Sequence, residues 1–217
     1  MVLWLVLSFI SFTYNIYYLQ MKIIFKKKHL IKHLKKEKNL GFVPTMGAIH
    51  NGHMSLIKKS QKMCSKTIVS IFVNKPQFNI KNDYKNYPRV LKNDIIKLKK
   101  NNVDFLFLPK SYDIYNDGPN KNIAISSFSK KLCGKNRPGH FRAVADVIDR
   151  FIKLINPSKI YFGEKDFQQL KILEDFIKKR HSNCIVVPCK TIREKNGIAC
   201  STRNNLLNNN EKILASK

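Results

Sequence analysis

Apolar runs that are typical of buried strands alternate along the chain with segments in which apolar residues recur every three or four positions, as they do in helices. This pattern predicts strands over residues 40–44, 66–74, 103–108, 158–162 and 184–188, and helices over 52–64, 141–154 and 168–179, with a further helix opened by Pro88. Residues 111–120 are rich in turn-forming residues and are expected to form a loop. Strands that alternate with helices predict an α/β fold with a mostly parallel sheet.

The first 20 residues differ from the rest of the chain because they are apolar and aromatic and carry no charge. They lack the basic start and the small-residue cleavage site of a signal peptide, and polar residues interrupt the apolar run. We therefore expect residues 1–20 to be a dispensable extension or the product of a mis-assigned start. An uncleaved membrane anchor is the alternative.

The 217 residues carry 41 Lys and Arg against 14 Asp and Glu, which gives a formal net charge of +27. Such a charge can mark a nucleic-acid-binding module. The lysines, however, are spread along the chain together with many Asn and Ile residues, as AT-rich codon usage produces, so we expect no nucleic-acid partner. The five cysteines are scattered and form no CxxC pair, which indicates reduced thiols in a cytoplasmic protein.

Residues 41–53 are the most informative segment, and read Gly-Phe-Val-Pro-Thr-Met-Gly-Ala-Ile-His-Asn-Gly-His. They predict a strand, a turn and a helix start, where unpaired backbone N–H groups attract phosphate. Gly47 and Gly52 let a bulky anion approach the backbone. His50 and His53 fall on one face of the first helical turn. Two imidazole donors at this place favour chemistry in which negative charge builds on phosphates.

Polar residues follow two other predicted strands. Asn74 and Gln77 offer uncharged groups that suit a hydroxyl-bearing substrate, although this segment alone is more typical of an ordinary turn. Gly163 permits close approach of the backbone to a ligand, and Lys165 is a point charge suited to phosphate. Ligands of parallel sheets bind beyond the carboxyl ends of the strands, so these residues and the histidine pair are expected to meet at one cleft.

Two basic segments are further candidates. Arg137 and His140 precede a predicted helix and can hold a carboxylate or a phosphate, although a solvated basic loop fits them equally well. Ser201, Thr202 and Arg203 can grip a triphosphate, although alone they are more typical of a polar surface turn. The sequence has no Walker motif, no GxGxxG and no HExxH or Cys/His cluster, so it supports neither P-loop, dinucleotide nor zinc chemistry.

In their order and spacing, these segments resemble the pantothenate synthetase (pantoate–β-alanine ligase) family. The matching segments are 43–53, 71–74, 87–89, 137–142, 161–169 and 201–204, and the resemblance runs from about Met21 to Leu207. It implies a Rossmann-like domain of the HxGH nucleotidyltransferase superfamily over residues 21–200, which binds nucleotide and pantoate. Residues 201–217 would be the start of a truncated C-terminal domain.

The resemblance also implies an activity. Pantoate would attack the α-phosphorus of ATP to give pantoyl adenylate and pyrophosphate, and the amine of β-alanine would then form pantothenate and release AMP. Catalysis of the first step is mostly positioning and neutralisation of charge. The implied setting is a cytoplasmic homodimer that uses small-molecule substrates, with neither a nucleic-acid nor a membrane partner.

Residue roles follow from the resemblance by position. His53 would be the proton donor, His50 would steady the phosphates and Lys165 would offset charge at phosphorus, with Arg203 as a further catalytic residue. Mg²⁺ would accompany ATP, with Asp94 as its partner. Pantoate would be bound by Gln77, Gln169, Asn74, Arg137 and His140. ATP would be bound by Met46, Gly47, Ala48, Ile49, His50, Asn51, Gly52, His53, Gly163, Glu164, Lys165, Asp166, Ile192, Cys200, Ser201, Thr202 and Arg203.

The chain departs from the family pattern in several places. Lys75 separates Asn74 from its usual proline, and Ala143 replaces a usual glycine. Cys200 and Thr202 replace a usual methionine and serine. The C-terminal region is short for the family, which leaves a degraded, non-catalytic relic as one alternative. Another HxGH nucleotidyltransferase is a second alternative.

Overall fold

The computed structural model describes residues 21–216, so the expectation for residues 1–20 lies outside it. Its centre is a parallel sheet with the strand order β1-β4-β3-β2-β5-β6. The strands are β1 (Lys22–Ile24), β2 (Leu40–Thr45), β3 (Lys66–Ile71), β4 (Phe105–Phe107), β5 (Lys159–Gly163) and β6 (Ile185–Cys189). The predicted α/β fold with a parallel sheet is confirmed.

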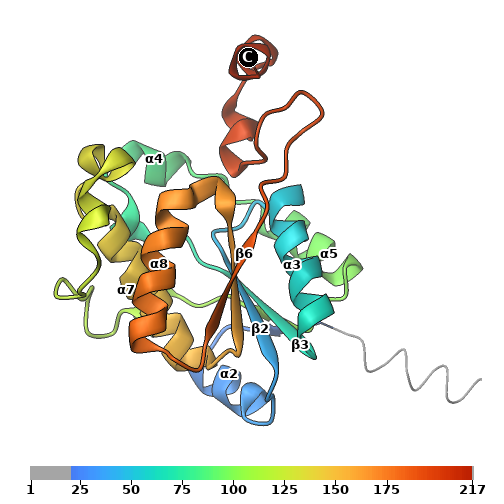
Figure 1. Ribbon diagram of the computed structural model, residues 1–217. Helices are drawn as coiled ribbons and strands as arrows, with labels where there is room; N and C mark the ends of the chain where they lie inside the picture. The colour runs from blue at the N-terminus through green and yellow to red at the C-terminus, as the bar shows by residue number, and fades with distance from the viewer. Residues whose placement is uncertain (1–20, 217) are drawn as a thin grey trace, which may run out of the picture.

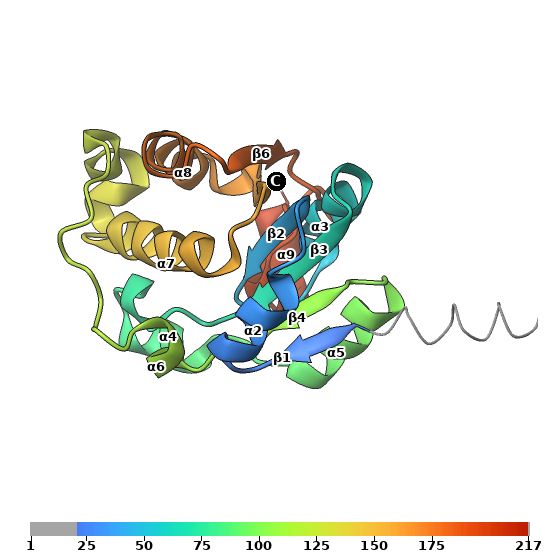
Figure 2. The same ribbon diagram turned by 90° about the horizontal axis from the view of Figure 1, so that it is seen from below.

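Helices cover both faces of this sheet (Figures 1 and 2). The helices are α2 (Lys27–Leu34), α3 (Asn51–Met63), α4 (Lys81–Asn86), α5 (Leu91–Lys100), α6 (Ser111–Ile114), α7 (His140–Ile155), α8 (Phe167–Arg180) and α9 (Asn209–Ala215). Phe42 of β2 packs in the core formed with α2, α7 and α8, whereas its neighbour Val43 packs in the core formed with α3 and α5. Alternate side chains of a strand point to opposite faces, so the near-continuous apolar runs in the sequence follow from this three-layer packing.

The structure adds elements that the sequence pattern did not reveal. The short strand β1 pairs with β4 at one edge of the sheet, and α2 covers the sheet through Leu30 and Leu34 despite its many lysines. The predicted strand over 66–74 ends at Ile71, and the helix expected from Pro88 begins at Leu91. Residues 111–114 form the short helix α6 within the predicted loop. The helical pattern over 52–64 also predicts that Met63 faces inward, but Met63 is 42% exposed.

The sheet reverses its strand order at β2. From β2 the chain proceeds to β3 and β4 on one side, and later returns to β5 and β6 on the other side. In sheets of this kind the crevice beyond the carboxyl ends of the strands at the reversal is the usual ligand site. After β6 the chain leaves the carboxyl edge of the sheet and leads to α9. This helix lies apart from the rest of the molecule (Figure 1).

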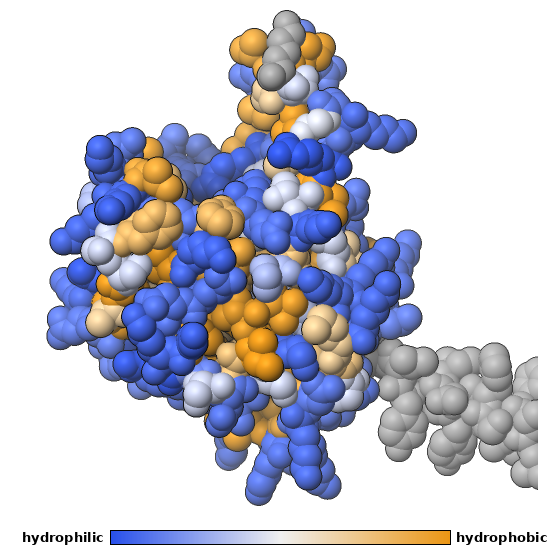
Figure 3. Space-filling view, in the orientation of Figure 1, coloured by the Kyte–Doolittle hydropathy of each residue, from blue (hydrophilic) through white to orange (hydrophobic). Residues whose placement is uncertain are grey.

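The surface is mainly hydrophilic on the face shown in Figure 3, with an apolar area over the edge strand β6, where Ile185 is 58% exposed. Within residues 21–216, no helix combines the length and apolar character needed to cross a membrane.

Candidate active site

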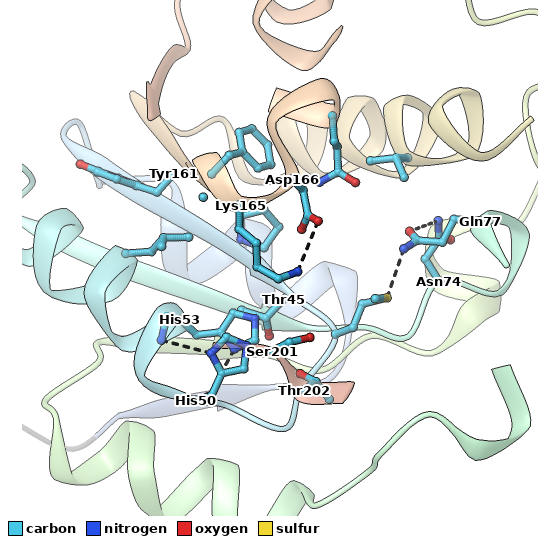
Figure 4. A pocket seen from close by; sticks show the side chains of 18 of the residues that line it. Thr45, His50, His53, Asn74, Gln77, Tyr161, Lys165, Asp166, Ser201 and Thr202 are labelled. Carbon is cyan, nitrogen blue, oxygen red and sulfur yellow. Dashed lines mark hydrogen bonds and ion pairs between the residues drawn. The ribbon is translucent and has the colours of Figure 1, made fainter. Parts of the chain in front are cut away.

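A pocket lies at the reversal of strand order and is lined by the carboxyl ends of β2 and β5 (Figure 4). It also receives residues from the start of α3, the loop after β3, helix α7 and the chain after β6. The predicted meeting of the histidine pair with the turn at 163–166 is therefore confirmed. Of the predicted site residues, Met46, His50, Gly52, His53, Asn74, Gln77, Arg137, His140, Gly163, Lys165, Asp166, Gln169, Ile192, Cys200, Ser201, Thr202 and Arg203 line the pocket.

The histidine pair begins helix α3 and closes its first turn. His50 is the N-cap residue, and its Nδ1 accepts a hydrogen bond from the Gly52 amide at 3.1 Å. His53 Nδ1 in turn accepts from the His50 amide at 3.4 Å, and the two rings stack with centroids 3.9 Å apart. An Nδ1 that accepts a backbone proton carries none itself, so each neutral ring bears its proton on Nε2. The cap thus fixes both imidazoles as Nε2–H donors.

The electrostatic setting keeps these rings neutral. Burial, with the charges of Lys165 and Lys97, lowers the pKa of His50 from its ordinary 6.5 to about 4. Burial, with His50 and the same two lysines, lowers the pKa of His53 to about 3. Both histidines are therefore uncharged hydrogen-bond donors near neutral pH, and positive charge in the pocket comes from lysine and arginine.

Two glycines of the motif have a steric explanation. Gly52 lies so close to His50 that a Cβ there would meet the imidazole Cε1 at 2.8 Å, so only glycine lets the ring fold back onto its own helix. Gly47 has φ = +85°, a backbone conformation that side chains disfavour, and it allows the sharp turn between β2 and α3. The two glycines thus let the chain double back with the histidines at its tip.

Helix α5 holds this turn from behind. The two carboxylate oxygens of Asp94 accept hydrogen bonds from the amides of Ala48 at 2.9 Å and Ile49 at 2.7 Å, and Asp94 is 2% exposed. One turn later on α5, the Lys97 ammonium donates to the Ile49 carbonyl oxygen. Asp94 lies behind the motif loop and is not among the pocket-lining residues. The two oxygens of Asp94 hold the loop. Asp94 therefore does not reach the pocket in which the predicted Mg²⁺ would accompany ATP.

The other predicted site residues do not line the pocket. Gly47, Ala48, Ile49 and Asn51 form the turn and the start of α3 behind the histidines, and Glu164 is exposed in the short 3₁₀ turn after β5.

Cationic side chains reach the pocket from separate segments. Lys165 follows β5 and extends into the space between the histidine pair and Gln77 (Figure 4). Arg203 pairs with Asp83 of α4 at 2.9 Å and lies over the ring of Tyr87. The pKa of Arg137 is lowered, first by burial and next by the charge of Arg203, so two guanidinium groups influence one another across the pocket. Such mutual repulsion favours an anion between them.

The chain after β6 closes one side of the pocket. Ser201 Oγ caps a 3₁₀ turn by accepting from the Arg203 amide, and the Thr202 hydroxyl donates to the carbonyl oxygens of Gly47 and Ala48 at 3.4 Å each. Thr202 thereby links this segment to the histidine turn, and its hydroxyl is engaged by the backbone.

The opposite end of the pocket is built from amides. The Asn74 Nδ2 group donates to Gln77 Oε1 at 3.0 Å, and Gln77 Nε2 donates to the sulfur of Met46 at 3.3 Å (Figure 4). His140 Nδ1 donates to the backbone oxygen of Gln77 at 2.8 Å. Burial lowers the pKa of His140 to about 4, so this ring too is neutral and serves to hold the backbone of Gln77.

Comparison with known proteins tests the resemblance. The family model described as pantoate-beta-alanine ligase matches residues 20–217. The pantothenate synthetase of Caldicellulosiruptor saccharolyticus is 41% identical over 194 residues, covering 89% of this chain and 69% of the relative. That of Sulfurihydrogenibium sp. is 44% identical over 184 residues, covering 84% and 66%. The chain belongs to the pantoate–β-alanine ligase family.

Solved structures of the family have the same fold. The pantoate-beta-alanine ligase of Francisella tularensis, described as a complex with beta-gamma ATP and beta-alanine, superposes with a TM-score of 0.84 at 38% identity, covering 90% of this chain and 77% of its own. The pantothenate synthetase of Thermus thermophilus superposes with a TM-score of 0.83 at 34% identity, covering 90% and 71%. Residues 21–216 therefore carry the α/β fold of pantoate–β-alanine ligases.

Sequence reasoning missed several residues of this ligase pocket. The helix α7 contributes an apolar wall of Val144, Val147, Ile148 and Phe151, which periodicity alone could identify only as core. Sequence reasoning also missed Tyr115, which does not line the pocket and lies in the segment predicted as a loop, yet its hydroxyl donates to the pocket residue Asn74 at Oδ1, at 2.7 Å. A turn-rich sequence gives no signal for such a contact, because the contact depends on the tertiary fold.

Mg²⁺, which the family resemblance implies, has no matching donor set in the part of the chain that is described. That part has no group of three or more His, Cys, Asp or Glu side chains arranged to hold a metal. Asp94 is the predicted partner, and both of its oxygens accept from backbone amides. We therefore assign no protein residue to Mg²⁺ and no catalytic step to it.

Proposed function

We propose that the pocket joins pantoate to β-alanine in two steps at the expense of ATP. A carboxylate oxygen of pantoate attacks the α-phosphorus, and the bond to the β-phosphate breaks, which gives pantoyl adenylate and pyrophosphate. The amine of β-alanine then attacks the acyl carbon, and the bond to the phosphate oxygen breaks, which gives pantothenate and AMP. The observation that carries this proposal is the meeting of two neutral imidazole donors with Lys165 at the reversal of strand order.

At the phosphate end, the Nε2–H groups of His50 and His53 donate to oxygens that gain charge as the bond to pyrophosphate breaks. A neutral ring fixed by its backbone contacts needs no reorganisation at that moment, which is the basis of electrostatic catalysis. Lys165 offsets charge at the α-phosphate, and Arg203 binds the outer phosphates. The ion pair of Arg203 with Asp83 keeps that guanidinium at the rim of the pocket.

At the acid end, Gln77 and Gln169 bind the polar groups of pantoate, with Asn74, Arg137 and His140 around them. The apolar wall of α7, from Val144 to Phe151, suits the two methyl groups of pantoate. The pocket therefore offers one surface that is complementary to the polar acid end of such a substrate and another that is complementary to its compact apolar middle. This pairing favours pantoate over a phosphate-bearing acceptor, and so favours the ligase over another HxGH nucleotidyltransferase.

We further propose a metal ion, a location and an oligomeric state for this enzyme. Mg²⁺ would arrive bound to the phosphates of ATP and keep water in its shell, as this ion commonly does. Cytoplasmic residence fits the use of ATP and the five cysteines, all of which are free. A homodimer would use the apolar area over β6, and residues 201–217 would belong to a second domain.

Product analysis tests the proposed function. The full chain is incubated with ATP, pantoate and β-alanine, and pantothenate and AMP are quantified by mass spectrometry. We expect one AMP for each pantothenate and no turnover when pantoate is withheld. Formation of ADP in place of AMP would mean that the γ-phosphate is transferred, and would contradict adenylation. Pyrophosphate release with other acceptors in place of pantoate, with the nucleotide retained in the product, would support a different nucleotidyltransferase. ATP binding without any product would support the non-catalytic relic.

A further inference from the structure

Tyr115 does not line the pocket but makes a hydrogen bond to a residue that does. Its hydroxyl is 2.7 Å from Asn74 Oδ1, and Asn74 is 1% exposed. The ring of Tyr115 stacks under the guanidinium of Arg150, 4.8 Å from the centroid, so the side chain is fixed on its outer side. Arg150 is itself fixed by Asp146 at 2.7 Å and by the backbone oxygen of Gly118 at 2.8 Å.

The orientation of the Asn74 amide follows from its partners. Its Nδ2 lies 3.3 Å from the carbonyl oxygen of Ala143, which can only accept. Nδ2 must therefore face α7, and Oδ1 must face Tyr115, whose hydroxyl then donates. The second proton of Nδ2 goes to Gln77 Oε1 at 3.0 Å. A rotation of this amide by half a turn would place two oxygens against one another at Ala143.

The orientation of Asn74 fixes that of Gln77. Because Oε1 accepts from Asn74, Nε2 is the atom of Gln77 that is left for the pocket. Within residues 21–216, this Nε2 donates a hydrogen bond to the thioether sulfur of Met46 at 3.3 Å, and a thioether sulfur is a weak acceptor. His140 holds the backbone of the same residue. Gln77 thus offers an N–H donor, and not a carbonyl oxygen, to an incoming ligand.

We propose that Tyr115 is a positioning residue that makes Gln77 a hydrogen-bond donor to the acid substrate, through Asn74. This inference rests on the proposed function, in which Gln77 binds pantoate. An oxygen acceptor on the substrate replaces the sulfur of Met46 as the partner of Nε2. If the tyrosine hydroxyl is absent, Asn74 Oδ1 loses its donor, and only the longer contact of Nδ2 with the Ala143 carbonyl oxygen, at 3.3 Å, opposes a turn of both amides. Such a turn would present Gln77 Oε1 to a carboxylate or hydroxyl oxygen of the substrate.

The test compares Tyr115→Phe with Tyr112→Phe in the full chain. Phenylalanine keeps the ring on Arg150 and removes only the hydroxyl, whereas Tyr112 is 63% exposed and provides the same chemical change on the surface. We measure KM for pantoate and for ATP, kcat, the calorimetric Kd of pantoate and the thermal midpoint. Tyr115→Phe should raise KM and Kd for pantoate about tenfold, as the loss of one hydrogen bond does. KM for ATP and kcat should stay within about twofold of those of Tyr112→Phe.

A third variant separates this inference from the proposed function. Gln77→Glu replaces the donor by a carboxylate and should weaken pantoate binding by at least as much as Tyr115→Phe. If Gln77→Glu weakens binding and Tyr115→Phe does not, the control by Tyr115 is wrong while the role of Gln77 stands. If Gln77→Glu has no effect, both are wrong. A parallel loss in both KM values, kcat and the thermal midpoint of Tyr115→Phe would indicate a merely structural tyrosine and overturn the inference.

Discussion

Replacing Asp94 by asparagine tests how the histidine turn is held. The carboxylate accepts from the Ala48 and Ile49 amides at 2.9 and 2.7 Å, in a place that is 2% exposed. Asparagine keeps one oxygen and places an NH₂ group against the second amide. Two donors then face one another, and a buried N–H loses its partner.

The size of the effect follows from that loss. A hydrogen bond to a charged group contributes about 1.5–3 kcal/mol, and an unpaired buried donor adds its own cost, so Asp94→Asn should lower the free energy of unfolding by about 2–3 kcal/mol. In a chain of this size the thermal midpoint should fall by roughly 5–10 °C. The turn carries His50, so the rate of ATP–pyrophosphate exchange should fall by about tenfold or more, since small displacements of catalytic groups are costly.

The assay is calorimetry combined with exchange kinetics at rising Mg²⁺ concentration. Asp175→Asn is the matched control, because Asp175 pairs with Lys179 on the surface of α8 and its side chain is 38% exposed. The control should change neither the midpoint nor the exchange rate measurably. A wild-type midpoint in Asp94→Asn, together with activity restored by high Mg²⁺, would refute the reasoning and show that Asp94 is a metal ligand.

Three further predictions follow from the same geometry. His53→Ala should reduce adenylation by about two orders of magnitude or more, because it removes an Nε2–H donor, and near-normal exchange would exclude the assigned role. The free energy of unfolding should fall as the pH drops from about 6.5 towards 4, since in that range the unfolded chain takes up protons that the buried His50 and His53 refuse. The slope is up to about 1.4 kcal/mol per pH unit for each histidine, and melts of His53→Gln should show a flatter slope, whereas an unchanged slope would contradict the lowered pKa. Gly41→Ala should destabilise the protein by about 2 kcal/mol, because its Cβ would crowd Ser60, Cys64 and Tyr161 where α3 covers β2 and β5; an unchanged melting temperature would show that these side chains move aside at little cost.

Much of the fold could be predicted because its signals are local. Buried parallel strands leave near-continuous apolar runs, and helices such as α7 repeat apolar residues at helical spacing. The elements that were missed include β1, α2 and α6. Strand β1 and helix α6 are short, and tertiary contacts stabilise them more than their own sequence does. Strand β1 has three residues and depends on pairing with β4.

The site could be predicted only as far as chemistry resides in contiguous segments. The turn at 46–53 and the turn at 163–166 are marked in the sequence by glycine, histidine and lysine next to strands, and both line the pocket. The hydrogen bonds that hold these segments in place could not be predicted, because they join residues far apart in the sequence. Asp94 reaches Ala48 across 46 residues, and Tyr115 reaches Asn74 across 41. A single sequence carries no signal for such pairs.

Pantoate-dependent exchange of labelled pyrophosphate into ATP is the most direct test of the central claim, which is that the histidine turn and Lys165 form one adenylating site. The exchange is measured on the full chain in the absence of β-alanine, for the wild type, His53→Ala and Lys165→Met. The account predicts exchange that requires pantoate in the wild type and falls by about a hundredfold or more in each variant. Exchange that persists without pantoate, or that survives both substitutions, would contradict it.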